Sequence, residues 1–416
     1  MSERPTHGPS PIPPLASLSA YKVPHHQAPI DLWLHGNEGA PPPAALWRAL
    51  SDVEVLRRYP SAAALEATLA ASLDVPPEAV LVTAGADDAL DRVFRAYLAS
   101  GWGRREIILP EPTFVMLPHY ARIVGAGVCS IPWPFEAFPE DAVLAAIGPA
   151  TRAIALVSPN NPTGAVIAPD AVTRIAHAAP DALVLVDLAY GELADVDLWQ
   201  TARLLPNALV FRTFSKAWGL AGARVGYVVG RPELLQPLRA VAPPYAVSGP
   251  SLAVAAARFA TGLEDMHDYC ARVRGERQAL YDTLVAIGTA PVRSQANFVF
   301  TRLGRPARAL WLRDALAGLG IGIRAFPAEP AIADGVRITC PADELGMRRL
   351  VAALGVALRP DGWAFGRTVA EIGQARAAGL VPVGLGDPHG PGAAALVAAG
   401  AARIVSDVDA LVEEVT

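Results

Sequence analysis

The sequence predicts an α/β protein whose main domain has a mostly parallel sheet. From Leu46 to Gly262, short apolar runs alternate with helical stretches, and this alternation is typical of strands joined by covering helices. After that region a long helix and further strands indicate a smaller α+β domain, and a short α/β extension follows. We expect four parts: an N-terminal arm over 1–45, a large domain over 46–262, a small domain over 263–358 and the extension over 359–416.

The strands of the large domain are expected where apolar residues form short uninterrupted runs. Helical stretches such as 86–98 and 170–178 separate these runs. Active residues should then lie on loops beyond the strand ends, as in other open α/β sheets. The expected strands are 80–83, 106–109, 153–157, 182–186, 208–211 and 225–229.

The small domain is expected to begin with one long helix around 251–287. A second helix near 307–317 should follow, and the extension from 363 onward repeats a strand–helix theme twice. The strands expected in the small domain are 297–300, 321–326 and 336–339.

Composition excludes several classes of protein. The chain has 416 residues, and 52% of them are hydrophobic, which is enough for large buried cores. Its net charge is -5 and it has no block of basic residues, so we do not expect a nucleic-acid-binding protein. Cys129, Cys270 and Cys340 are far apart, which predicts neither a disulfide framework nor a metal site and fits a reducing cytoplasm. We do not expect the proline-rich, charged N-terminus to be a signal peptide, and no apolar run reaches membrane-spanning length.

Lysine is rare in this chain. Only Lys22 and Lys216 occur among 35 basic residues, and the others are arginines. A lysine can lose a proton and attack a carbonyl as a neutral amine, which arginine cannot do. Lys216 lies beside hydroxyl and small residues and near Arg224, so we expect its amine to have a chemical role. An ordinary surface lysine is the alternative.

Polar side chains lie at the ends of two other predicted strands. Asp187 ends an apolar strand, where a carboxylate can pair with a protonated pyridine nitrogen and make the ring an electron sink. Tyr190 could reach the phenolic oxygen of the ring. Asn161 lies in a rigid turn between two prolines that can aim its amide at the same oxygen. The alternatives are a helix cap, a core aromatic and a plain turn.

A phosphate cup is expected near the start of the helix at 86. Ala86 and Asp87 open this helix, whose backbone N–H groups can approach a phosphate. Ser215 and Arg224 could complete the cup, since arginine offers a bidentate fork to phosphate. Phe114 could stack on the ring, although simple core packing is its alternative role.

Together, in this order and spacing, these residues resemble the fold-type I pyridoxal-phosphate enzymes, the aspartate-aminotransferase superfamily, over about residues 20 to 357. Within it the chain looks most like histidinol-phosphate aminotransferase. The family's usual Asn-Glu-Asn is Asn37-Glu38 followed by Gly39 in this chain. The other matching motifs are Tyr21 with Pro24, Arg58-Tyr59-Pro60, Gly85-Ala86-Asp87, Pro112-Thr113-Phe114, Asp187-Leu188-Ala189-Tyr190, Ile323-Arg324 and Val336-Arg337-Ile338-Thr339.

The resemblance implies pyridoxal 5'-phosphate as cofactor and a role for each matching residue. Lys216 would be the Schiff-base lysine and proton carrier, with Asp187 at the ring nitrogen and Asn161 and Tyr190 at the ring oxygen. Arg337 would bind the substrate anion. The phosphate would be surrounded by Ala86, Asp87, Thr213, Ser215, Arg224 and the partner subunit's Tyr59, and Arg324, Tyr21 and Asn37 would lie near the substrate.

The activity implied is transamination between an anionic or phosphorylated amine and a 2-oxo acid, in a cytoplasmic homodimer that binds neither nucleic acid nor membrane. Threonine-phosphate decarboxylase is a close relative with the same frame, so decarboxylation of a phosphorylated amino acid stays open. Aromatic transaminases and pyridoxal enzymes of secondary metabolism also share the frame. A pyridoxal-binding scaffold or regulator is the non-enzymatic alternative.

The extension looks like the C-terminal part of a haloacid-dehalogenase-type phosphatase. That family places Gly-Asp-x-x-x-Asp here to hold magnesium, but this chain has Arg367 and Glu371 at the two aspartate positions. A guanidinium cannot ligate Mg²⁺, and no nucleophilic Asp-x-Asp precedes the extension. We therefore expect no phosphatase activity. The extension could be a fusion remnant packed on the main body or an interaction module.

Overall fold

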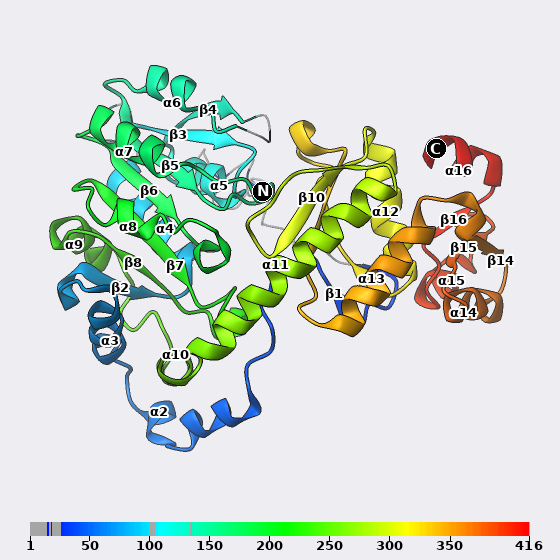
Figure 1. The fold of residues 1–416 in the computed structure, drawn as a ribbon, viewed down its shortest axis with the longest axis horizontal. Coiled ribbons are helices and arrows are strands. Elements are labelled where there is room, and N and C mark those ends of the chain that lie inside the picture. Colours follow the sequence, from blue (N-terminus) through cyan, green and yellow to red (C-terminus); the bar gives the residue numbers. More distant parts are fainter. Residues whose placement is uncertain are drawn as a thin grey trace, which may run out of the picture.

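The large domain contains a seven-stranded sheet in the order β2-β8-β7-β6-β5-β3-β4 (Figure 1). The computed structural model describes residues 15, 18, 26–99, 101, 103, 105–133, 135 and 137–415. In this described sheet β8 runs antiparallel to its neighbours β2 and β7, and all other pairs are parallel. The strands are β2 (Val80–Thr83), β3 (Glu106–Glu111), β4 (Gly127–Pro132), β5 (Thr151–Val157), β6 (Leu183–Asp187), β7 (Ala208–Thr213) and β8 (Gly226–Val229).

The predicted α/β class with a mostly parallel sheet is confirmed. The six apolar runs form strands because helices cover both faces of the sheet, as β5 shows. Its Ala153 and Ala155 pack on one face with α4 (Ala86–Val93), α5 (Met116–Val124) and α9 (Pro232–Ala240). Its Ile154 and Leu156 pack on the other face with α7 (Pro169–Ala178).

The sequence pattern did not reveal β4. This strand lies at the edge of the sheet, and only Ile131 of its six residues is buried. An edge strand with an exposed face has no continuous apolar run. A search for apolar runs therefore finds the central strands and passes over this one.

The expected single helix at 251–287 is two helices. α10 (Gly249–Thr261) packs against the large domain, and α11 (Leu263–Ala286) runs along the small domain. They separate at Gly262, where a Cβ would lie 2.7 Å from the carbonyl oxygen of Arg258. The sequence pattern continues across this break because both helices bury apolar residues, so periodicity alone did not show it.

The small domain has an antiparallel four-stranded sheet in the order β12-β13-β10-β9. The expected strand at 321–326 is also divided, because β11 pairs with the N-terminal strand β1 and β12 pairs with β13. The elements are β1 (Leu32–Trp33), β9 (Ala290–Pro291), β10 (Phe298–Arg302), α12 (Pro306–Gly318), β11 (Ile321–Gly322), β12 (Arg324–Ala325), β13 (Gly335–Thr339) and α13 (Glu344–Ala357).

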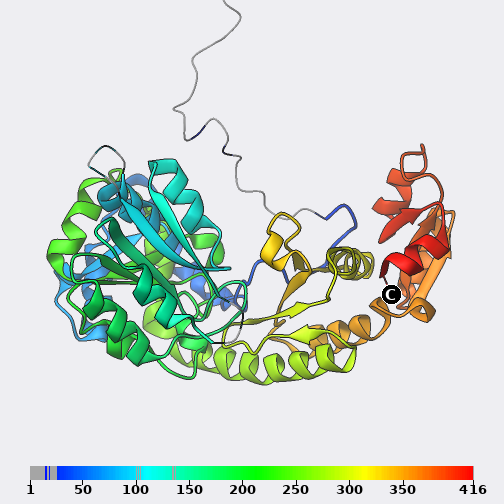
Figure 2. The same cartoon turned by 90° about the horizontal axis from the view of Figure 1, so that it is seen from above.

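The extension forms a parallel three-stranded sheet at the far end of the molecule from the large sheet (Figure 2). It repeats the strand–helix unit three times, once more than expected. Arg403 pairs with Asp314 of α12 at 2.9 Å, and the Trp363 and Trp311 rings lie 4.6 Å apart. The elements are β14 (Trp363–Gly366), α14 (Val369–Ala377), β15 (Val381–Leu385), α15 (Ala393–Ala398), β16 (Arg403–Val405) and α16 (Val408–Val415).

Within the described part of the chain, no helix combines the length and apolar character needed to span a bilayer. The domain limits given by the sequence remain a prediction.

Candidate active site

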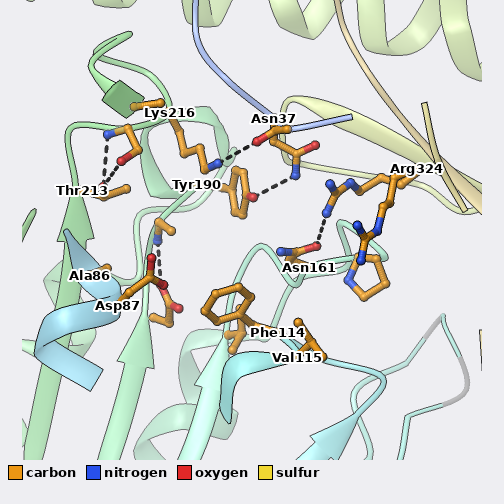
Figure 3. A pocket seen from close by; sticks show the side chains of 18 of the residues that line it. Asn37, Ala86, Asp87, Phe114, Val115, Asn161, Tyr190, Thr213, Lys216 and Arg324 are labelled. Carbon is orange, nitrogen blue, oxygen red and sulfur yellow. Dashed lines mark hydrogen bonds between the residues drawn. The ribbon is translucent and has the colours of Figure 1, made fainter. Parts of the chain in front are cut away.

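A cavity of about 330 Å³ lies where the large domain, the small domain and the N-terminal segment meet (Figure 3). Loops that follow β2, β3, β5, β6 and β7 supply its floor, as expected at the carboxyl edge of an open α/β sheet. The small domain closes it with Arg324 and Arg337. Side chains more than 250 residues apart in the chain therefore face one space.

Lys216 lies on the loop after β7. Its Nζ donates a hydrogen bond to the carbonyl oxygen of Gly36 at 3.1 Å and lies 5.7 Å from the centre of the Tyr190 ring. The N-terminal segment approaches this loop closely. A Cβ on Gly39 would lie 1.9 Å from the carbonyl oxygen of Lys216, and one on Gly219 would lie 2.1 Å from that of Ala40. The close approach explains why this chain has glycine at position 39.

Asp187 is the last residue of β6 and is buried. The Ala189 N–H donates a hydrogen bond to its Oδ1 at 2.9 Å. Burial raises the pKa of this carboxyl to about 6, and the hydrogen bond from Ala189 offsets only part of the effect. Among the described residues Asp187 forms no ion pair, so this carboxylate would gain from a cationic ligand.

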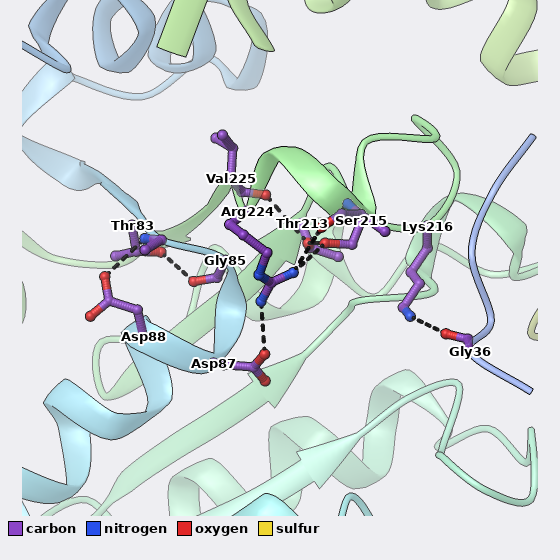
Figure 4. A network of polar contacts seen from close by, with 12 residues as sticks. Gly36, Thr83, Gly85, Asp87, Asp88, Thr213, Ser215, Lys216, Arg224 and Val225 are labelled. Carbon is purple, nitrogen blue, oxygen red and sulfur yellow. Dashed lines mark hydrogen bonds and ion pairs between the residues drawn. The ribbon is translucent and has the colours of Figure 1, made fainter. Parts of the chain in front are cut away.

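A polar corner lies at the N-terminus of α4 (Figure 4). Arg224 pairs through Nη2 with Asp87 at 3.0 Å, and its Nη1 donates to the Ser215 hydroxyl at 3.4 Å. Thr213 in turn donates to the Ser215 hydroxyl at 2.9 Å. The first turn of α4, beginning at Ala86, borders the same cavity, and the first N–H groups of a helix have no partner within it. An arginine, hydroxyls and a helix N-terminus together suit a phosphate.

Asn37, Asn161 and Tyr190 are held by other site residues. Asn37 Nδ2 donates to the Tyr190 hydroxyl at 2.9 Å, and Asn37 Oδ1 accepts from the Thr339 hydroxyl at the same distance. Asn161 Oδ1 accepts a hydrogen bond from Arg337 Nη1 at 2.5 Å. The turn after β5, the N-terminal segment and β13 are thus joined by side chains around the cavity.

The small domain supplies two cations from adjacent strands. Arg324 and Arg337 are direct partners in the β12–β13 register, so their side chains leave the sheet on one face. Arg337 Nη2 donates to the His35 carbonyl oxygen at 2.6 Å. Two arginines at the mouth of a cavity suit an anionic substrate group.

Two ionisable residues of the cavity were missed by the sequence analysis. Burial lowers the pKa of His35, and its buried Nδ1 has no hydrogen-bond partner among the described residues. Burial raises the pKa of Glu329, although Arg324 and Arg337 oppose that rise. Neither residue follows a strand of the large sheet or belongs to a motif, so no local signal could have identified it.

Most residues named from the sequence do line this cavity. Tyr59 does not: its side chain is 81% exposed on the surface of the single chain, where it stacks on Tyr245 with ring centres 4.4 Å apart. Tyr21 lies outside the described residues. The residues found together are Asn37, Ala86, Asp87, Phe114, Asn161, Asp187, Tyr190, Thr213, Ser215, Lys216, Arg224, Arg324 and Arg337.

The arrangement of sheet, lysine loop and small domain is that of the fold-type I pyridoxal-phosphate enzymes. The chain belongs to the family described as aminotransferase class I and II, which matches residues 33–354. It is therefore an aminotransferase by family, and the extension lies outside the matched region.

Two curated relatives have different substrate names. The chain is 34% identical over 336 residues to histidinol-phosphate aminotransferase of Symbiobacterium thermophilum, covering 78% of this chain and 90% of the relative. It is 36% identical over 341 residues to aromatic amino acid aminotransferase of Mycobacterium avium, covering 79% and 92%. Similarity of sequence thus supports the family more firmly than a single substrate.

A solved structure of an aminotransferase also matches this chain. Histidinol-phosphate aminotransferase from Sinorhizobium meliloti, in complex with pyridoxal 5'-phosphate, superposes with a TM-score of 0.75 at 25% identity. The match covers 84% of this chain and 97% of that one. The family therefore implies pyridoxal phosphate as cofactor.

The cavity fits this cofactor chemically. Asp187 provides a buried carboxylate for a protonated ring nitrogen, and the Arg224 corner provides donors for a phosphate. Lys216 Nζ lies in the same cavity. A cationic ring nitrogen, a phosphate and an amine-reactive aldehyde would each find a complementary group.

Proposed function

We propose that the chain is a pyridoxal-phosphate-dependent aminotransferase of the histidinol-phosphate type, which transfers an amino group between an anionic amine and a 2-oxo acid. The observation that carries the proposal is the convergence of Lys216, Asp187 and Arg337 on one cavity. The amine, the carboxylate and the guanidinium supply the three functions that transamination requires: proton transfer, charge balance at the ring and substrate binding.

When bound, pyridoxal phosphate supplies an electron sink for the substrate carbanion. Asp187 would keep the ring nitrogen protonated, because its buried carboxylate is stabilised by that positive charge. Ser215, Arg224 and the N-terminus of α4 would hold the phosphate, and Asn161 and Tyr190 would face the ring oxygen. Lys216 Nζ would carry a proton from the substrate α-carbon to the reactive carbon of the bound cofactor.

Arg337 would bind the negatively charged part of the substrate, with Arg324 beside it. Asn161 already occupies Arg337 Nη1 at 2.5 Å, which holds the guanidinium toward the cavity. A bidentate arginine is well matched to either a carboxylate or a phosphate. The two arginines therefore select an anion without deciding between these groups.

The test is a half-reaction with separate amines. Purified enzyme loaded with cofactor is mixed with histidinol phosphate, phenylalanine or threonine phosphate, and conversion of the cofactor to its amine form is followed by absorbance. We expect conversion fastest with histidinol phosphate. Faster conversion with phenylalanine would replace this substrate by an aromatic amino acid, and carbon dioxide release from threonine phosphate would select the decarboxylase alternative.

We infer that two chains form a homodimer in which Tyr59 of one chain completes the phosphate corner of the other. Several apolar side chains near Tyr59 are exposed in the single chain, and such a patch marks an interaction surface. Light scattering should give twice the chain mass, and an active monomer would contradict the inference. The exposed residues are Trp47, Val53, Leu56, Tyr59 and Tyr245.

We propose that the haloacid-dehalogenase-like extension stabilises the small domain and the N-terminal segment of its own chain. Arg376 Nη2 donates to the Pro29 carbonyl oxygen at 2.9 Å, and Arg403 pairs with Asp314. Glu371 accepts hydrogen bonds from the backbone N–H groups of Arg367 and Thr368 and so caps α14. Unchanged stability and activity after deletion of 360–416 would contradict the proposal. A cytoplasmic location remains a prediction.

A further inference from the structure

A second cavity lies behind the active site, between α11, the β9–β10 region and the large domain. Its volume is about 890 Å³, and it shares no lining residue with the first cavity. One wall is formed by Gly164, Ala165 and Val166, which follow the turn that carries Asn161. The aminotransferase reaction proposed above makes no use of this space.

Four arginines line this cavity, in a chain whose net charge is -5. Arg274, Arg277 and Tyr281 lie on one face of α11, because they are spaced three and four residues apart. Arg293 and Arg302 face them from the β9–β10 region. The only acidic residue in the described lining is Asp195.

The four cations are not equally neutralised. Arg302 pairs with Asp334 at 2.9 Å, and Arg274 approaches Asp195 at 3.9 Å. Arg277 and Arg293 form no ion pair with any described residue. Arg277 Nη1 donates only to the Ala296 carbonyl oxygen at 3.1 Å, and the Arg293 guanidinium lies 4.9 Å from the centre of the Tyr281 ring.

Burial lowers the pKa of Arg277, and the Asp195 carboxylate opposes this shift only in part, because it forms no ion pair with Arg277. The Arg293 guanidinium lies over the Tyr281 ring, which favours this position, and donates no hydrogen bond to another described residue. Two guanidinium groups with unused donors, one half-buried and one ordered, form a preorganised site for an anion with several oxygens.

We propose that this second cavity binds a small phosphate-bearing molecule through Arg277 and Arg293, with Arg274 and Arg302 adding to the positive field. The ligand would lie beside Ser294 and Gln295. The Gln295 N–H donates to the Gly164 carbonyl oxygen at 2.8 Å, and a Cβ on Gly164 would lie 2.0 Å from Ser294 Oγ. The ligand would thus contact Ser294 and Gln295, the residues that pack against the turn carrying Asn161.

The experiment is isothermal titration of the cofactor-loaded enzyme with inorganic pyrophosphate. We expect saturable binding that weakens about 10²–10⁴-fold in Arg277→Gln/Arg293→Gln, since each lost hydrogen bond to a charged group weakens binding about 10–100-fold. Arg348→Gln is the matched control, because Arg348 is an exposed helical arginine away from this cavity. It should bind pyrophosphate like the unmodified enzyme.

The variant Arg337→Gln tests whether pyrophosphate binds in the active site instead of the second cavity. Binding that disappears in Arg337→Gln but persists in the double variant would place the pyrophosphate at the active site and overturn the proposal. Absence of saturable binding to the unmodified enzyme would overturn it as well.

Arg293→Gln alone, at an exposed side chain, should still weaken binding, and thermal unfolding shows whether each variant is folded. Citrate in place of pyrophosphate tests whether carboxylates suffice, and binding as tight as that of pyrophosphate would overturn the phosphate assignment.

Discussion

The two arginine-bearing cavities of this protein are built differently. In the active site, Arg337 extends from a buried strand and is fixed by Asn161 and the His35 carbonyl oxygen. In the second cavity, Arg277 and Arg293 extend from a helix and a loop, and neither forms an ion pair with a described residue. The first arrangement suits a substrate that must be oriented for chemistry. The second suits a ligand that needs only to be held.

The largest effect is expected for Lys216, because only the first of the two cavities has a lysine among its described lining residues. Lys216→Ala should reduce turnover by at least about 10³-fold, because it removes both the covalent anchor and the proton carrier. The measurement is steady-state turnover together with the absorbance of the bound cofactor. Lys22→Ala, at the only other lysine, is the control and should retain activity. Full activity in Lys216→Ala would refute the site.

Asp187→Asn should reduce turnover by roughly 10²–10³-fold, the range seen when a preorganised electrostatic group is lost. A neutral amide cannot stabilise a protonated ring nitrogen as the buried carboxylate does. Turnover should fall while pyrophosphate binding in the second cavity is unchanged. A variant with normal turnover would show that the ring nitrogen does not depend on Asp187.

The cofactor-free protein should lose stability as pH rises from about 4 to 7. The pKa of Asp187 is raised to about 6 by burial, so its contribution is fully present below the unfolded pKa near 3.8 and is lost as pH rises through about 6. The difference of about two units corresponds to about 3 kcal/mol. Urea unfolding of the cofactor-free wild type and Asp187→Asn at both pH values measures it. An identical pH dependence in the two proteins would contradict the assignment.

Arg337→Gln should raise KM for the anionic amine about 10–100-fold, since a charged hydrogen bond is worth about 1.5–3 kcal/mol. Arg277→Gln should leave KM nearly unchanged, because Arg277 lines the other cavity. Steady-state kinetics with both variants tests the separation directly. A similar rise of KM in both would mean that the cavities act as one.

The smallest effect concerns Gly39, where the chain departs from the family pattern. Gly39→Ala should destabilise the protein by about 1–3 kcal/mol, because its Cβ would overlap the carbonyl oxygen of Lys216. Gly373→Ala in α14 is the control, since no atom lies within 4 Å of a Cβ at that position. Urea unfolding of both variants gives the comparison. Equal stability would show that the N-terminal segment can move away.

The sequence by itself determined the fold class, six of the seven strands of the large sheet and most of the residues that line the candidate active site. Asp187, Asn161 and Lys216 each follow an apolar strand, and parallel strands bring their carboxyl ends to one edge. Local patterns therefore located groups that are distant in the chain. The same patterns could not show the break at Gly262, because apolar residues are buried on both sides of it. They also could not show the edge strand β4, because only one of its residues is buried.

Only the tertiary structure decided which residues of other elements join these groups. His35 and Glu329 enter the cavity because the N-terminal segment and the small domain fold over it. A Cβ at Gly39 would collide with the Lys216 loop, because a segment 177 residues earlier in the chain lies against that loop. The second cavity likewise exists only when α11 packs beside the β9–β10 region. Such contacts depend on the packing of whole elements, which no short stretch of sequence encodes.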